Sequence, residues 1–305
     1  RALNDMDIIT DDPEITEARK TALELLLSEH AGDCEAPCRI ACPAFMNIPQ
    51  MNRLIAAGLI QEALDLVMKD IILPGVLGRI CPAPCESVCK RGPIDQAVAV
   101  CLLKRFAADH ALYRPTTQAI IPTGKNAAII GAGPAGLSAA YYLQIKGIQA
   151  SIFDENPDPG GSIRYQIPDA VLDKKILDKE VAFIRQSGVR FNHNHLIDKA
   201  GFTWLRREYD VLVVAGGKLT QAMHDWGMAH NGKEIIVDRH SFQTSLEGVF
   251  AIGGANRPTQ MAIRSAAQGK QLAILIQQLL ANEPLTGEPK RFNSSIGKLR
   301  PEEYG

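Results

Sequence analysis

The chain has 305 residues, of which 46% are hydrophobic and 22% are charged, and its formal net charge is −1 at pH 7. This length and apolar content allow two modest cores, and the balanced charge offers no electrostatic footprint for nucleic acid. No run of about 18 apolar residues is present, which excludes a membrane-spanning helix, and no export signal is visible. We therefore expect a cytoplasmic protein with reduced cysteines.

Short helices are predicted along the first third of the chain. An amphipathic helix is expected over residues 14–29, after the start signal of Pro13. Two cysteine-rich loops follow it, and three further helices lie around them, over residues 49–57, 59–69 and 96–110. Residues 1–112 are thus expected to form a small helical domain.

The seven cysteines are clustered in the sequence. Each of the two loops carries three, and Cys101 follows on the last predicted helix; the loop cysteines are Cys34, Cys38, Cys42, Cys81, Cys85 and Cys89. Zinc sites favour pairs of cysteines with two residues between them, whereas spacings of three beside a proline suit loops around iron–sulfur clusters. The pattern favours 4Fe–4S clusters, with zinc, disulfides and free thiols as the alternatives.

A second domain is predicted over residues 126–283. Residues 113–125 contain two prolines and are expected to be the linker that precedes it. The domain opens with an apolar strand at 126–130, a glycine turn and a helix that begins near Leu137. Residues 284–305, which are rich in proline, glycine and charge, are expected to form an extended tail that lies on a partner or on the body of the protein.

The glycine turn has the spacing that dinucleotide phosphates require. Gly131 makes the tight turn, Gly133 lets the backbone approach a pyrophosphate, and Gly136 allows close packing of helix on strand. The next strand, 149–153, delivers Asp154, whose carboxylate can accept a hydrogen bond from an adenosine ribose hydroxyl. NAD and FAD share this fingerprint, so the turn alone leaves the choice between them open.

Several segments resemble a known family. Cys42-Pro43 and residues 47–49, 78–86, 104–109, 131–140 and 160–168 resemble the small subunit of glutamate synthase and the N-terminal region of dihydropyrimidine dehydrogenase. Two later strands, 209–217 and 248–254, followed by a helix over 259–280, resemble the closing part of a glutathione-reductase-type FAD domain. The resemblance implies an α/β Rossmann-like FAD-binding domain preceded by a small all-α iron–sulfur domain.

The resemblance also implies where FAD binds. The last helix, starting near Pro258, is expected to direct free backbone N–H groups at the flavin pyrimidine. No side chain is expected to act as a catalytic acid, base or nucleophile. The implied FAD-binding residues are Gly131, Gly133, Pro134, Ala135, Gly136, Asp154, Glu155, Gly161, Ser162, Arg164, Ile167, Gly216, Gly253, Gly254, Thr259, Gln260 and Met261.

The cysteines depart from the family pattern. An opening cysteine is absent near Ala31, and Lys104 stands where relatives carry a Gln or Glu ligand, but Cys101 lies one helical turn earlier on the same face. The resemblance suggests two 4Fe–4S clusters. Cys42, Cys81, Cys85 and Cys101 would hold one, and Cys34, Cys38 and Cys89 the other, with a fourth ligand left open between His30 and Asp33.

Three further departures concern the flavin domain. Relatives insert an NADPH-binding domain before the strand at 248–254, but residues 218–247 are too few for a domain of about 100 residues. Gly254 replaces the aspartate that usually bonds the ribityl or pyrophosphate part of FAD, and Val171 replaces an arginine beside the flavin. Each replacement removes one polar contact.

These features predict an electron-transfer subunit of a multisubunit oxidoreductase. FAD and 4Fe–4S clusters would exchange electrons with partner subunits that hold the NAD(P)H, ferredoxin or substrate site. One alternative is a self-sufficient reductase that takes NAD(P)H directly. A second is a structural adaptor without catalysis.

Overall fold

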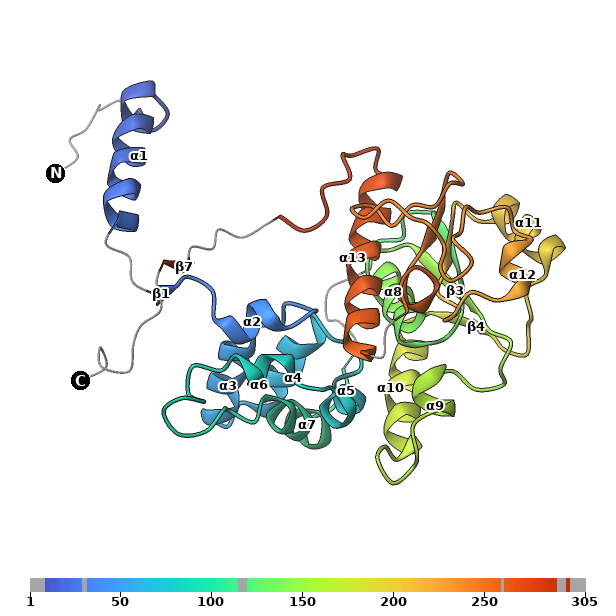
Figure 1. Cartoon of the computed structure of the whole chain (residues 1–305), viewed down its shortest axis with the longest axis horizontal. Coiled ribbons are helices and arrows are strands. Elements are labelled where there is room, and N and C mark those ends of the chain that lie inside the picture. The colour runs from blue at the N-terminus through green and yellow to red at the C-terminus, as the bar shows by residue number, and fades with distance from the viewer. Residues whose placement is uncertain (1–8, 29–31, 115–119, 259–260, 290–294, 297–305) are drawn as a thin grey trace. The chain divides into compact units, whose positions relative to one another are not determined.

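The computed structural model describes residues 9–28, 32–114, 120–258, 261–289 and 295–296. It divides into two compact units, one of residues 1–36 and 291–305 and the other of residues 37–290. The first unit contains α1 (Pro13–Ser28), β1 (Gly32–Asp33) and β7 (Ser295–Ile296). The two strands pair antiparallel, so the segments near the two chain ends lie side by side (Figure 1).

The second unit begins with a layer of short helices. Proline occupies the first turn of several of them, where its missing N–H costs no hydrogen bond. The helices predicted over 49–57 and 59–69 are confirmed in this layer. Its members are α2 (Pro37–Ala41), α3 (Ile48–Ala56), α4 (Ile60–Met68), α5 (Pro74–Ile80), α6 (Pro84–Ser87) and α7 (Val100–His110).

The last helix of this layer is shorter than the sequence predicts. It was expected over 96–110, but α7 begins at Val100. The backbone N–H of Val98 donates to Cys89 Sγ at 3.5 Å, and the N–H of Cys101 donates to Glu86 Oε1 at 2.8 Å. The second cysteine loop therefore binds the residues that would have formed the first helical turn.

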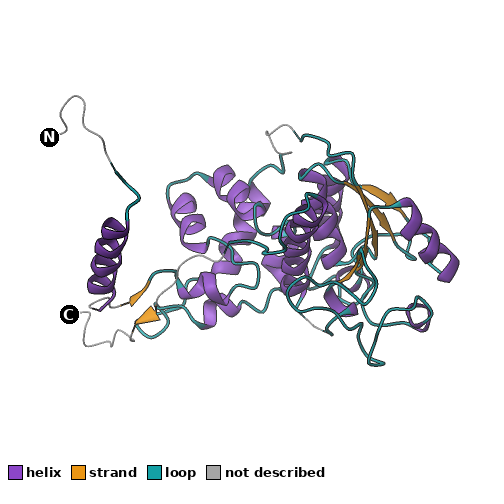
Figure 2. Ribbon diagram, turned by 90° about the horizontal axis from the view of Figure 1, so that it is seen from above, coloured by secondary structure: helices purple, strands orange, loops and turns teal. Residues whose placement is uncertain are grey.

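The remainder of the second unit is built on a parallel sheet. Among the described residues the strand order is β4-β3-β2-β5-β6, and the strands are buried at the centre of the sheet (Figure 2). Parallel sheets need cover on both faces, which explains these continuous apolar runs. The strands are β2 (Asn126–Ile130), β3 (Gln149–Phe153), β4 (Arg190–Asn192), β5 (Val211–Val214) and β6 (Val249–Ala251).

Helices cover the two faces of the sheet. One face of β2 packs against α8 (Pro134–Ile145), α10 (Lys174–Gln186) and α13 (Ala262–Leu280). The alternate residues of the same strand pack against α11 (Lys199–Glu208) and α12 (Gln221–His224). The short α9 (Ser162–Tyr165) and a 3-10 turn, η1 (Gly253–Ala255), follow strand ends. The arrangement confirms the Rossmann-like α/β fold expected from the sequence.

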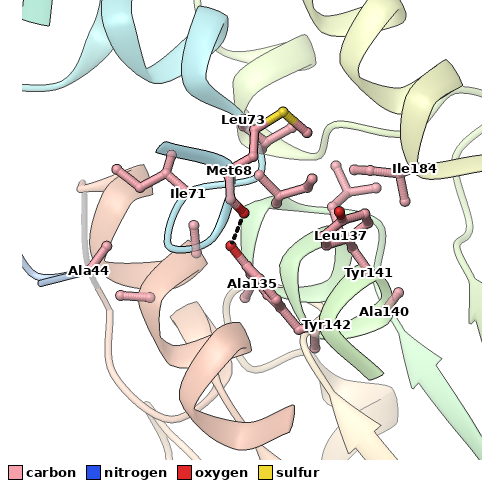
Figure 3. Close-up of a cluster of buried hydrophobic side chains, with 14 of the residues drawn as sticks. Ala44, Met68, Ile71, Leu73, Ala135, Leu137, Ala140, Tyr141, Tyr142 and Ile184 are labelled. Atoms are coloured by element: carbon pink, nitrogen blue, oxygen red, sulfur yellow. Dashed lines mark hydrogen bonds between the residues drawn. The ribbon is translucent and has the colours of Figure 1, made fainter. Parts of the chain in front are cut away.

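One core runs through both the helical layer and the sheet layer of the second unit. Figure 3 shows Met68, Ile71 and Leu73 from the helical layer beside Tyr141 and Tyr142 of α8. The hydroxyl of Tyr142 donates to the Met68 carbonyl at 3.0 Å. This shared core fixes the helical layer against the sheet layer.

A buried and a half-buried carboxylate add polar links across the same boundary. Glu180 of α10 accepts hydrogen bonds from the N–H groups of Gly75 (2.5 Å) and Val76 (3.2 Å) at the start of α5, and from the Tyr113 hydroxyl (2.6 Å). Asp70 pairs with Lys270 of α13 at 2.6 Å. Among the described residues no helix is long and apolar enough to cross a membrane.

Candidate functional site: a glycine-turn nucleotide site and a cysteine layer

The glycine turn lies between β2 and α8, and its glycines have different physical roles. Gly131 has φ +109°, and a Cβ there would lie 2.7 Å from the backbone of Ala215. A Cβ on Gly136 would lie 1.9 Å from the carbonyl oxygen of Gly131. Both positions therefore require glycine for the fold itself. Gly133 is different, because a Cβ there would meet nothing within 4 Å.

The open space at Gly133 fits a pyrophosphate. Gly133 is the N-cap of α8 and has an extended backbone, with φ −75°. The first N–H groups of a helix have no partner within the helix, and the helix dipole favours negative charge there. Pro134, Ala135 and Gly136 form the first turn of α8 and are buried. These residues fit the phosphates of a dinucleotide.

Asp154 follows β3 and is buried, with 8% of its surface exposed. Its Oδ2 accepts from the N–H of Ala132 at 2.5 Å, and its Oδ1 accepts from Asn156 at 2.8 Å. The carboxylate thus holds the glycine turn in place. Oδ1 also accepts from the Asn156 side-chain amide at 2.9 Å, so the remaining acceptor capacity for a ribose hydroxyl lies on Oδ2. Glu155 beside it is exposed.

The loop before α9 packs onto the glycine turn. Gly160 donates to the Ala132 carbonyl at 2.8 Å, and Gly161, with φ +52°, lies close to Gly133. Arg164 donates to the Pro159 carbonyl at 2.6 Å and pairs with Asp178 of α10. Its guanidinium therefore braces the loop. The other two predicted residues of this segment differ in exposure: Ser162 is exposed and Ile167 is half-buried.

The end of β6 explains one departure from the family pattern. A Cβ on Gly254 would lie 3.0 Å from the backbone of Gly217. An aspartate at 254 would thus require that backbone to move. Gly253 has φ +65° and donates to the Gln268 side chain at 2.7 Å. The backbone after β6 thus lies directly against the backbone of Gly217, which follows β5.

The connection between β5 and β6 is short. Residues 215–248, all of them described, contain α12 and the isolated bridge of His230 to Ile235, and Gln243 of this connection bridges to Phe250 of β6. A Cβ on Gly216 would lie 2.7 Å from Met223 Cε of α12. The connection therefore folds back over the strand end.

The last predicted segment of the nucleotide site is only partly described. The helix expected from residue 259 begins at Ala262, with Met261 as its N-cap, so its start lies beyond the predicted position near Pro258. Thr259 and Gln260 lie outside the described residues. Met261 is half-buried and packs against the main core.

The cysteine layer brings Cys101 to the second cysteine loop. The Cys101 thiol forms hydrogen bonds with Cys81 and Cys85; the bond with Cys101 raises the pKa of Cys81 and lowers the pKa of Cys85. Cys42 also interacts with Cys85, and both are buried. The four cysteines that the resemblance assigns to one cluster thus lie in one neighbourhood.

Cys38 and Cys89 form a second neighbourhood. Cys38 interacts with Cys89 and with Cys42, and burial raises the pKa of Cys38. Cys34 is exposed and belongs to the first unit. His30 and the side chain of Asp33 lie outside the described residues, so the fourth ligand stays a prediction.

The donor set fits an iron–sulfur cluster, because cysteine thiolates are the ligands that such clusters use. All seven cysteines are free thiols in this structure. Among the described residues, no group of three or more His, Cys, Asp or Glu side chains is arranged to hold one metal ion. A 4Fe–4S cluster is bound in a different way, because its four thiolates bind four separate irons.

Two residues of this layer were not predicted to be functional. Glu86 accepts from the Cys101 N–H and so sets where α7 begins. Lys104 is 3% exposed and lies among Cys81, Cys85 and Cys101. The sequence shows that Lys104 lies one helical turn after Cys101. It does not show that Lys104 is buried.

Residues 91–269, more than half of the chain, match the family described as pyridine nucleotide-disulphide oxidoreductase. The chain belongs to this family. Residues 16–115 match a second family, described as dihydropyrimidine dehydrogenase domain II, 4Fe-4S cluster. These matches confirm the resemblance found in the sequence, and they indicate FAD and a 4Fe–4S cluster as the cofactors of this oxidoreductase.

Three curated relatives of this oxidoreductase are subunits. The chain is 37% identical over 276 residues to the NADP(+)-dependent formate dehydrogenase subunit beta of Moorella thermoacetica, covering 79% of this chain and 39% of that protein. It is 35% identical over 188 residues to the NADPH-Fe(3+) oxidoreductase subunit beta of Geobacter sulfurreducens, covering 60% and 28%. It is 32% identical over 203 residues to the glutamate synthase [NADPH] small chain of Bacillus subtilis, covering 62% and 41%. The chain spans less than half of each relative.

Proposed function

We propose that this chain is the FAD and iron–sulfur electron-transfer subunit of a multisubunit oxidoreductase. The observation that carries the proposal is the short connection between β5 and β6. Residues 215–248 hold one four-residue helix and two bridges, where a nucleotide domain would need about 100 residues. The connection therefore holds no nucleotide-binding domain, and we infer that a partner supplies the donor or acceptor of the flavin's electrons.

The residues of the chain have distinct parts in this function. When bound, FAD supplies exchange between two-electron and one-electron carriers. The turn around Gly133 would bind the pyrophosphate, and Asp154 would orient the adenosine end. The shared core around Tyr142 and Met68 fixes the cysteine layer against α8, so both cofactor sites keep a constant relation within the second unit.

We also propose two cluster ligand sets. Cys42, Cys81, Cys85 and Cys101 would hold one cluster, supported by the contacts of Cys101 and Cys85. Cys38 and Cys89, with Cys34 from the sequence pattern, would hold a second. An iron content of about eight atoms per chain would support two clusters, and an iron content of about four would support one. The cytoplasm, where thiols stay reduced, suits these free cysteines.

The strand ends beside Gly216 and Gly217 suggest where a partner binds. Both lie where relatives continue into the NADPH-binding insertion, and a Cβ on Gly217 would meet nothing within 4 Å. A partner on this face would exclude water from the flavin, which strengthens the electrostatic contacts at the site.

Rapid mixing with nicotinamide nucleotides tests this function. The chain would be purified under anaerobic conditions, its flavin and iron counted, and its flavin absorbance followed after mixing with NADH or NADPH. We expect bound FAD and iron, no saturable nucleotide binding and no fast bleaching. Restoring the native partner subunits should allow reduction. Fast bleaching of the lone chain would favour the self-sufficient reductase, and absence of both cofactors would favour the adaptor.

A further inference from the structure

Lys104 is a buried cation without a carboxylate partner. Its side chain is 3% exposed on α7, and within the part of the chain that the structure describes no acidic side chain pairs with its ammonium. Removing an ammonium from water is costly unless another charge compensates it. A fold that keeps Lys104 buried therefore requires negative charge close to it.

Three predicted cluster ligands lie near Lys104. Lys104 follows Cys101 by one helical turn, so the two side chains share a face of α7. Lys104 is also within electrostatic range of Cys81 and Cys85. A cluster held by these cysteines would supply the compensating negative charge.

The neighbouring charges are already engaged elsewhere. Arg105, the next residue on α7, pairs with Asp109, and Asp109 also pairs with Arg79 at 2.9 Å. Glu86 accepts from the Cys101 N–H at the start of the helix. Arg39, the other buried cation of the cysteine layer, donates to the Phe45 carbonyl at 3.3 Å and lies over the Phe45 ring. Lys104 is thus the buried cation that shares a helix face with Cys101.

We propose that Lys104 is the fixed counter-charge of the 4Fe–4S cluster held by Cys42, Cys81, Cys85 and Cys101, and that it raises the reduction potential of that cluster. The inference rests on the proposed function, because it requires the cluster to be present. A cluster with four thiolates is an anion that gains further negative charge when it is reduced. A nearby fixed positive charge favours the reduced form, and net charge is one of the factors that set such potentials.

Replacing the charge while keeping the volume tests this role. The full chain would be purified anaerobically as Lys104→Met, Lys104→Arg and wild type, with Lys175→Met of α10 as a control that removes an exposed lysine. Iron content and a redox titration followed by electron paramagnetic resonance would be measured for each. We expect Lys104→Met to keep its iron but to shift the one-electron equilibrium at least tenfold toward the oxidised cluster, which is about 59 mV.

The control variants should keep the wild-type potential. Lys104→Arg retains the charge, and Lys175→Met loses a charge outside the cysteine layer. If Lys104→Met loses its iron, the proposal stands only if Lys104→Arg keeps both iron and potential; loss of iron in both variants overturns it. An unchanged potential in an iron-replete Lys104→Met also overturns it. Wild type without any iron–sulfur signal would instead contradict the proposed function.

Discussion

Gly133 and Gly136 stand in the same turn, yet they tolerate side chains differently. A Cβ at 136 would collide with the Gly131 carbonyl at 1.9 Å, whereas a Cβ at 133 would enter open space. The backbone at Gly133 is extended, so other residues adopt it without strain. Glycine at 136 therefore serves the fold, and glycine at 133 serves a ligand.

This difference predicts separate effects of two substitutions. Gly133→Val should leave the fold intact but weaken FAD binding by at least about tenfold, because its methyl groups occupy the pyrophosphate position. Gly136→Ala should lower the thermal stability of the protein. Flavin absorbance after gel filtration and circular dichroism melting would measure the two effects. Stoichiometric FAD in Gly133→Val would contradict the site assignment.

Glu180 shows how one residue joins distant elements. Its buried carboxylate accepts from the start of α5, and burial raises its pKa from 4.5 to about 7, against the lowering effect of the Tyr113 hydrogen bond and of Arg79. The unfolded chain releases this proton near pH 4.5, whereas the folded chain retains it until about pH 7. The stability that Glu180 contributes is thus complete below pH 4.5 and is lost as the pH rises toward 7.

A pH series on Glu180→Gln checks the sign of this effect. Relative to wild type, the variant should gain about 3 kcal/mol in unfolding free energy between pH 4.5 and 8, since a neutral amide has no proton to lose. Tyr113→Phe removes the hydrogen bond that lowers the pKa, so it should move the wild-type transition to higher pH. Urea unfolding at each pH provides the measurement, and a constant difference between Glu180→Gln and wild type would contradict the raised pKa.

At the scale of elements, α12 and α7 are both set by contacts with other segments. Met223 of α12 lies against Gly216, so the shortened connection covers the end of β5. The start of α7 is fixed by Glu86 and Cys89 of the second cysteine loop. In both cases the position of a short helix is therefore fixed by residues outside that helix.

At the scale of the whole molecule, the helical layer shares a core with one face of the sheet, and a second cluster lies on the other face. The helical layer and the sheet layer are joined by Met68 and Tyr142, by the Asp70 and Lys270 pair, and by Glu180. Elements that share a core unfold together when no intermediate buries enough surface by itself.

Anaerobic urea unfolding should therefore show one transition in this unit. Tryptophan fluorescence reports on the sheet side, through Trp204 and Trp226, and iron–sulfur absorbance reports on the cysteine layer. We expect the two probes to give the same midpoint and the same slope. Two separate midpoints would show that the helical layer and the sheet layer fold independently.

The sequence by itself determined the two cofactor classes and the family. Glycine spacing in a strand, turn and helix, and cysteine spacing in loops, are local patterns whose chemistry depends on residues close together in the chain. The tertiary structure alone decided that Lys104 is buried among thiols, that Glu180 caps α5, and that Gly254 touches Gly217. Burial and capping of this kind depend on segments far apart in sequence, which meet only when the core is packed.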